Sequence, residues 1–189
     1  CARDIWEDEQ RYSSVAETWG DYTYCDWSCA AFNCRREMMG MNLKVKPFKQ
    51  SKGYCGPASL KMILSAHGIE KSEKYLAKLT KTSRKKGCGE KNILKAAKSF
   101  GLGGFGKKQS TIKEVKRLVG KGKYVIVDWF SPEEAGHYSV VAGFGKDKIL
   151  LADPHFGKIM KYKIKWFEER WFDLVDGKII LREIIVIYK

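Results

Sequence analysis

The sequence predicts an α+β domain over residues 41–189, with N-terminal helices packed on an antiparallel sheet. The first half of this region has apolar residues at helical spacing, and the second half has short β-branched runs such as Tyr-Val-Ile-Val. Because helices and strands are segregated along the chain instead of alternating, the sheet is expected to be antiparallel. Composition changes abruptly near residue 40, so residues 1–40 are expected to be a separate, appended segment.

Four helices are expected, in order along the chain. The first begins at Gly56-Pro57, where proline costs no hydrogen bond, and ends at Gly68, a residue type that suits a helix end. The apolar residues Leu60, Ile63 and Leu64 lie at helical spacing between them. The other three helices are expected over 72–79, 90–100 and 111–119.

Strands are expected after the helices. A Gly103-Gly104 pair resembles a double-glycine cleavage signal only superficially, and its glycine-rich surroundings favour a turn. Short runs rich in Val and Ile then favour strands. The expected strands are Tyr124 to Phe130, His137 to Ala142, Lys148 to Ala152, Lys158 to Lys163 and Ile179 to Tyr188.

Residues 1–40 differ from the rest in charge and in cysteine content. They hold four Arg, no Lys and eight acidic residues, and four of the six cysteines: Cys1, Cys25, Cys29 and Cys34. Disulfides, a metal site and cysteines of no chemical role remain open here, although no second ligand pair and no histidine follows to complete a zinc site. The segment is interpreted as a pro-segment, a tail or a fused peptide.

The domain at 41–189 is strongly basic, with 32 basic and 14 acidic residues. Such a surface can attract nucleic acid, anionic membrane or an acidic peptide, including residues 1–40 of the same chain. The lysines lack the interleaved aromatic residues of a strand-binding platform, which argues against nucleic acid. No apolar run reaches the roughly 18 to 20 residues of a membrane span. The compartment stays open, with the cytoplasm slightly favoured.

Cys55 is the candidate nucleophile. The run Tyr54-Cys55-Gly56-Pro57 places it at the start of the first expected helix. Free N–H groups and the partial positive charge of a helix N-terminus favour the thiolate, the reactive form. A buried structural cysteine is the alternative, and position alone does not separate the two.

His137 is the candidate base, and Asp153 is the candidate that orients it. The chain has three histidines, and His67 lies too far along the helix of Cys55, at roughly 18 Å, to reach the thiol. A hairpin centred on Gly145 with a loop over 143–147 would place His137 and Asp153 directly opposite each other. The aspartate would then hold the imidazole in the required tautomer. His155, in a turn after Asp153, is a weaker competitor.

Two further residues were weighed for the same site. Gln50, five residues before Cys55, carries a side-chain amide that can donate to an oxyanion together with the Cys55 N–H. Cys88, between two glycines, could be a second thiol near the cleft, but a loop cysteine of no role is the better interpretation.

Together these residues resemble a known family. Gln50 with Tyr54-Cys55-Gly56-Pro57-Ala58-Ser59-Leu60, the Gly87-Cys88-Gly89 block, Gly136-His137-Tyr138-Ser139-Val140-Val141 and Asp153-Pro154 resemble the bacteriocin-processing, double-glycine-leader cysteine peptidases and their stand-alone relatives. The resemblance covers about 45 to 175. It implies a papain-like fold, with Cys55, His137, Asp153 and Gln50 as site residues.

The expected activity is that of a cysteine peptidase acting on a peptide or leader-type substrate by thiol acyl transfer, with no metal or organic cofactor. The Gln50-to-Cys55 interval is one residue shorter than in transporter-linked members, and no transporter domains follow. The alternative is a non-hydrolytic papain-like module that binds an acidic peptide or nucleic acid through its basic surface.

Overall fold

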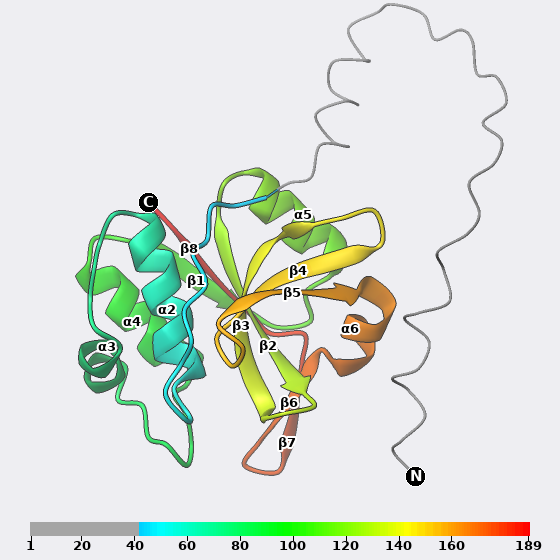
Figure 1. Cartoon of the computed structure of the whole chain (residues 1–189). Helices are drawn as coiled ribbons and strands as arrows, with labels where there is room; N and C mark the ends of the chain where they lie inside the picture. Colours follow the sequence, from blue (N-terminus) through cyan, green and yellow to red (C-terminus); the bar gives the residue numbers. More distant parts are fainter. Residues whose placement is uncertain (1–41) are drawn as a thin grey trace, which may run out of the picture.

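The computed structural model describes residues 42–189. The proposals made for residues 1–40, including the chemistry of their four cysteines, lie outside the described residues. The fold is α+β, as the sequence predicts: helices gather beside a six-stranded antiparallel sheet, with the order β1-β8-β2-β3-β4-β5 (Figure 1). A separate two-stranded hairpin, β6-β7, lies beside the ends of β2 and β3.

The elements follow the predicted order, and three further elements are present: strand β1, helix α6 and strand β6. The helices are α2 (Cys55–Ala66), α3 (Glu73–Leu79), α4 (Glu90–Ser99), α5 (Ile112–Gly120) and α6 (Ile164–Arg170). The strands are β1 (Gly103–Lys107), β2 (Tyr124–Ser131), β3 (Ala135–Phe144), β4 (Lys148–Asp153), β5 (Lys158–Lys163), β6 (Phe172–Val175), β7 (Lys178–Leu181) and β8 (Ile184–Tyr188).

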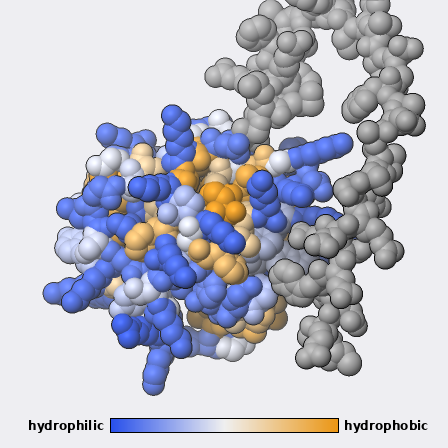
Figure 2. Space-filling view, viewed as in Figure 1, coloured by the Kyte–Doolittle hydropathy of each residue, from blue (hydrophilic) through white to orange (hydrophobic). Residues whose placement is uncertain are grey.

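Both faces of the sheet are buried, and alternating side chains along a strand belong to two hydrophobic cores, one on each face. Along β8, Ile185 and Ile187 pack with α2, α3 and α4, whereas Ile184 and Val186 pack with α5 and α6. This alternation follows from the two-residue period of a strand. The outer surface is mostly hydrophilic on the face seen in Figure 2, with a smaller hydrophobic area between the charged side chains.

The turn predicted at Gly103-Gly104 is wrong, because these residues belong to edge strand β1, which pairs with β8. The glycines serve close packing. A Cβ at Gly104 would lie 2.6 Å from the carbonyl oxygen of Val186 and 2.8 Å from Leu94 Cδ2. Glycine in a strand can mark such a close approach as well as a turn, and composition does not distinguish the two.

The single strand expected over Ile179 to Tyr188 is also wrong. The chain bends at Arg182, whose φ of 50° breaks the run into β7 and β8. The Arg182 N–H donates to the carbonyl of Trp171, 3.0 Å away, and holds the bend. β8 therefore enters the large sheet, while β7 pairs with β6 near the site described below.

Candidate active site

Cys55 is the first residue of α2, and the helix begins without a side-chain cap. The Ala58 N–H is bonded to the carbonyl of Tyr54 at 2.9 Å. The N–H groups of the first helical turn before it have no intrahelical partner. Cys55 is half-buried and forms no disulfide. Its thiol therefore meets the positive end of a helix at a surface that a substrate can reach.

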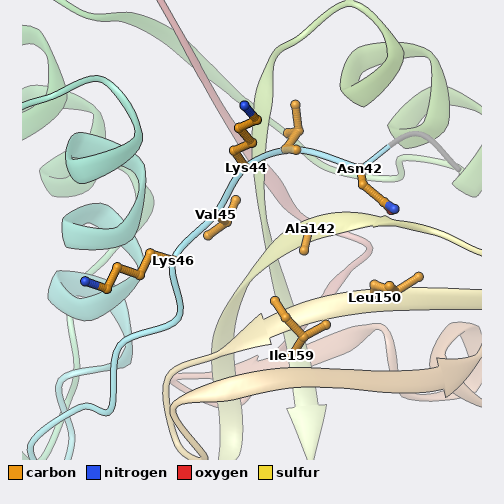
Figure 3. Close-up of a pocket in the computed structure, with 8 residues that line it drawn as sticks. Asn42, Lys44, Val45, Lys46, Ala142, Leu150 and Ile159 are labelled. Atoms are coloured by element: carbon orange, nitrogen blue, oxygen red, sulfur yellow. The ribbon is translucent and has the colours of Figure 1, made fainter.

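A cleft of about 1500 Å³ is lined by Cys55 and Gln50, whereas His137 and Asp153 are buried behind its wall and are not among the lining residues. Glu134, Tyr138 and His155 also line the cleft. A smaller pocket of about 450 Å³ lies between residues 42–46 and strands β3 to β5 (Figure 3). That second pocket is lined by Asn42, two lysines and apolar side chains such as Ile159, and none of the candidate site residues lines it.

His137 and Asp153 are in contact. His137 Nε2 lies 2.9 Å from Asp153 Oδ1, and both residues are 1% exposed. The predicted direct opposition is wrong, however, because Phe144 pairs with Ile149, so the hairpin is centred between Lys146 and Asp147 and not on Gly145; a bulge between Val141 and Gly143 also changes the register by one residue position. Val140 pairs with Ala152, so Asp153 lies diagonally across from His137, on the same side of the hairpin.

The surroundings of His137 stabilise its protonated form. Burial lowers the pKa of the imidazole, but its neighbours Asp153, Cys55 and Glu134 raise it, and the net pKa is well above its ordinary value. Nε2 is turned to Asp153, which leaves Nδ1 on the side of Glu134. The arrangement favours the protonated imidazole.

Glu134 is a residue that the sequence analysis missed. Its carboxylate accepts both hydrogen bonds of the Gln50 amide nitrogen, at 2.9 and 3.0 Å. It also lies 3.0 Å from His137 Nδ1, which makes no hydrogen bond of good geometry, and 3.2 Å from His155 Nδ1. These donors, led by His137, lower the pKa of Glu134 to about 2.

A sequence signal for Glu134 exists in retrospect. Ser131-Pro132-Glu133-Glu134 forms the turn before β3, and the Ser131 hydroxyl accepts the Glu134 N–H at 3.0 Å. A carboxylate three residues before the candidate base, in a turn held by serine, is placed to reach the imidazole.

Gln50 lines the cleft, and a backbone hydrogen bond holds it in place. Its N–H donates to the carbonyl of Pro154 at 2.8 Å, which ties the segment before α2 to the residue after Asp153. Its side-chain amide is directed to Glu134 and donates to both oxygens of that carboxylate.

The remaining histidines and Cys88 take different positions. His67 lies beyond the last turn of α2 and packs edge-on against Tyr124, with ring centroids 5.1 Å apart. His155 reaches the site only through Glu134, while its N–H donates to Asp153 Oδ1 at 2.9 Å. Cys88 packs directly on Gly56, and burial raises the pKa of its thiol to about 11. It is therefore a cleft residue that is neutral near pH 7.

Within 42–189, no three or more His, Cys, Asp and Glu side chains are gathered as metal ligands. In the same range, none of the helices has both the length and the apolar character that crossing a membrane requires.

Known proteins resemble both the sequence and the fold. The sequence model of the Peptidase_C39 like family matches residues 42–178. An uncharacterized protein of Methanothermobacter marburgensis is 31% identical over 112 residues, which cover 59% of this chain and 72% of that protein.

Among solved structures, the peptidase domain of Streptococcus ComA, a bi-functional ABC transporter involved in a quorum sensing pathway, has a TM-score of 0.63 at 25% identity. That match covers 76% of this chain and 98% of the domain. A double glycine motif protease from an AMS/PCAT transporter, in complex with the leader peptide, has a TM-score of 0.62 at 22% identity, covering 78% and 93%. A C39-like peptidase from Bacillus anthracis has a TM-score of 0.58 at 17% identity, covering 79% and 98%. The last two show likeness of fold alone.

Proposed function

Because the chain belongs to the Peptidase_C39 like family, we propose that it is a cysteine peptidase that cleaves peptides by acyl transfer to Cys55. The observation that carries the proposal is the buried His137–Asp153 pair, with 2.9 Å between Nε2 and Oδ1, and Cys55 among the groups that raise the pKa of the imidazole. A nucleophile, a base and a group that orients the base are the three parts such chemistry needs.

In the first step, the Cys55 thiolate attacks the carbonyl carbon of the scissile bond, and the carbonyl oxygen becomes an oxyanion. The Cys55 N–H and the Gln50 amide donate to that oxygen once Glu134 has released the amide. The His137 imidazolium then gives its Nδ1 proton to the leaving amine as the C–N bond breaks. A thioester and a new amino terminus remain.

In the second step, His137 takes a proton from water, which attacks the thioester and releases the carboxylic acid. Asp153 holds the ring by Nε2 throughout, so that Nδ1 stays directed to the thiol. A structural relative binds a leader peptide, which supports a leader-type peptide as the substrate class.

The test is covalent labelling of Cys55 by a peptide that carries a thiol-reactive electrophile, near neutral pH, with peptide mapping to locate the label. His137→Ala should slow labelling at least roughly 100-fold, because it removes the group that generates and holds the thiolate. His67→Ala, which alters a histidine outside the cleft, is the matched control. Labelling that does not depend on His137, together with no cleavage of a peptide library, would favour the non-hydrolytic binding module instead.

A further inference from the structure

Four carboxyl groups lie along one part of the Cys55 cleft and have no task in the reaction above. They come from Asp128 on β2, Glu183 just before β8, Asp173 on β6 and Glu90 at the start of α4, and all four line the cleft. Asp128 is 4% exposed and Glu183 is 5% exposed. A domain with such an excess of basic residues has no general reason to bury two acids here.

The four groups are close to one another and to the reacting residues. The carboxyls of Asp128 and Glu183 are hydrogen-bond neighbours, and the Asp128 N–H donates to the Glu183 carbonyl at 3.2 Å. The Asp173 carboxylate covers Gly136, the residue before His137. The cluster therefore begins next to the candidate base.

The position of Asp128 also follows from the sheet register. Asp128 pairs with Tyr138, so the two side chains share one face of β2 and β3. The Tyr138 ring lies 3.5 Å from where a Cβ on Gly56 would be. The Tyr138 side chain thus lies between Asp128 and the start of α2 at Cys55–Gly56. Cys55 is close enough to be among the groups that raise the pKa of Asp128.

Asp128 lacks a counter-charge. Among the described residues, no cation lies within ion-pair distance of its carboxyl group, and Glu183 is its hydrogen-bond neighbour. Burial first, and then the charges of Asp173 and Glu183, raise its pKa well above the ordinary range. Ionising such a buried acid is costly, and a cation that enters the cleft would offset that cost.

One lysine of the protein itself lies beside the cluster and shows that an ammonium group can approach it. Lys108 Nζ lies 3.8 Å from Glu183 Oε1, and the lysine side chain is 57% exposed. It is the only cation within ion-pair distance of any of the four carboxyls in the part of the chain that the structure describes. One exposed ammonium group does not balance four acids.

We propose that this cluster, with Asp128 as its main contact, receives the side chain of a lysine or arginine near the scissile bond of the peptide substrate. The inference rests on the proposed peptidase function and adds a substrate class to it. A purely structural role for the carboxyl pair is the competing explanation, and the variants below separate the two.

The experiment compares otherwise identical peptides that carry lysine or norleucine at each position within three residues of a cleavable bond. The first measurement is kcat/KM for cleavage, and the second is the rate of Cys55 labelling by matched peptide electrophiles. Wild-type enzyme should favour lysine over norleucine by roughly tenfold or more at one position, as expected for a hydrogen bond to a charged group.

Asp128→Asn should abolish that preference while leaving norleucine peptides cleaved, and Lys108→Met should increase it because a competing cation is lost. Asp147→Asn, an exposed carboxylate outside the cleft, is the matched control. If wild-type and Asp128→Asn cleave lysine and norleucine peptides alike, the inference is wrong but the peptidase stands. If neither peptide is cleaved and Cys55 is not labelled, the proposed function itself fails.

Discussion

The Glu134 carboxylate holds the Gln50 amide and lies beside the His137 imidazole, two groups that the proposed reaction needs free. Because its pKa is about 2, it is ionised near neutral pH. The turn before β3 therefore places an anion at the position that the proposed reaction assigns to the substrate oxygen. In that reaction, displacement of this carboxylate has to come first.

Glu134→Gln should speed peptide-directed labelling of Cys55 by roughly three- to thirtyfold, because a neutral amide holds the Gln50 donor less strongly than a carboxylate does. The measurement is the second-order labelling rate. Glu133→Gln removes the same charge from the adjacent exposed position and should change the rate less than twofold. A slower rate in Glu134→Gln would mean that the carboxylate supports the site instead of occupying it.

Asp153→Ala should lower kcat/KM by roughly 100-fold or more and move the alkaline limb of its pH profile to lower pH. The sign follows from His137: Asp153 raises the pKa of the imidazole, so its removal lets the imidazolium lose its proton at a lower pH. Asp147→Ala is the control. An alkaline limb that stays in place after the substitution would show that Asp153 does not tune the base.

The candidate site could be predicted from the sequence in part. Cys55, His137 and Asp153 could be proposed because a helix start and two strand ends can be recognised from local patterns. The register of His137 and Asp153 was not predicted, since the loop between β3 and β4 is shorter and later than the expected 143–147 loop and a bulge between Val141 and Gly143 changes the pairing again. Glu134 was missed because its importance arises from contacts with residues distant in sequence, such as Gln50.

At the scale of elements, α2 to α5 and β2 to β5 could be predicted because each carries a full local pattern of its own. Strand β1 could not, since its glycines are explained only by the closeness of Val186 and Leu94 across the sheet. Helix α6 begins without a side-chain cap and spans only seven residues, so its first turn carries no recognisable signal.

Gly104→Ala should therefore destabilise the fold although alanine is a mild substitution. Its Cβ would meet backbone and a packed leucine, and overpacking of this kind costs about 1–3 kcal/mol. For a protein of this size that corresponds to a Tm lower by roughly 2–12 °C, measurable by calorimetry. Gly145→Ala is the control, because the nearest atom to its Cβ would be 3.8 Å away. Equal Tm values for the two variants would mean that β1 tolerates the added carbon.

At the scale of the whole molecule, the basic domain buries the Asp128–Glu183 carboxyl pair at the junction of the large sheet and the β6-β7 hairpin. The pKa of each is raised, chiefly by burial, and for Asp128 next by Asp173 and Glu183. The folded protein thus binds these protons more tightly than the unfolded chain does. Burial of the Asp128–Glu183 pair therefore has two effects. Ionisation of either acid destabilises the fold, and a cationic side chain in the cleft would offset that cost.

Asp128→Asn should make the protein more stable than wild type at pH 8 and no more stable near pH 4. The stability that the protonated Asp128 contributes is complete below its unfolded pKa of about 4 and is lost as pH rises through the raised folded pKa. Asparagine cannot ionise, so the Tm difference between variant and wild type should grow with pH, by at most roughly 3–5 °C per pH unit. Titration of His137 occurs in both proteins and cancels in the difference. The control, Asp147→Asn, should have the same Tm as wild type across this pH range. If Asp128→Asn is less stable than wild type at pH 8, the buried carboxylate has a partner that stabilises its charge.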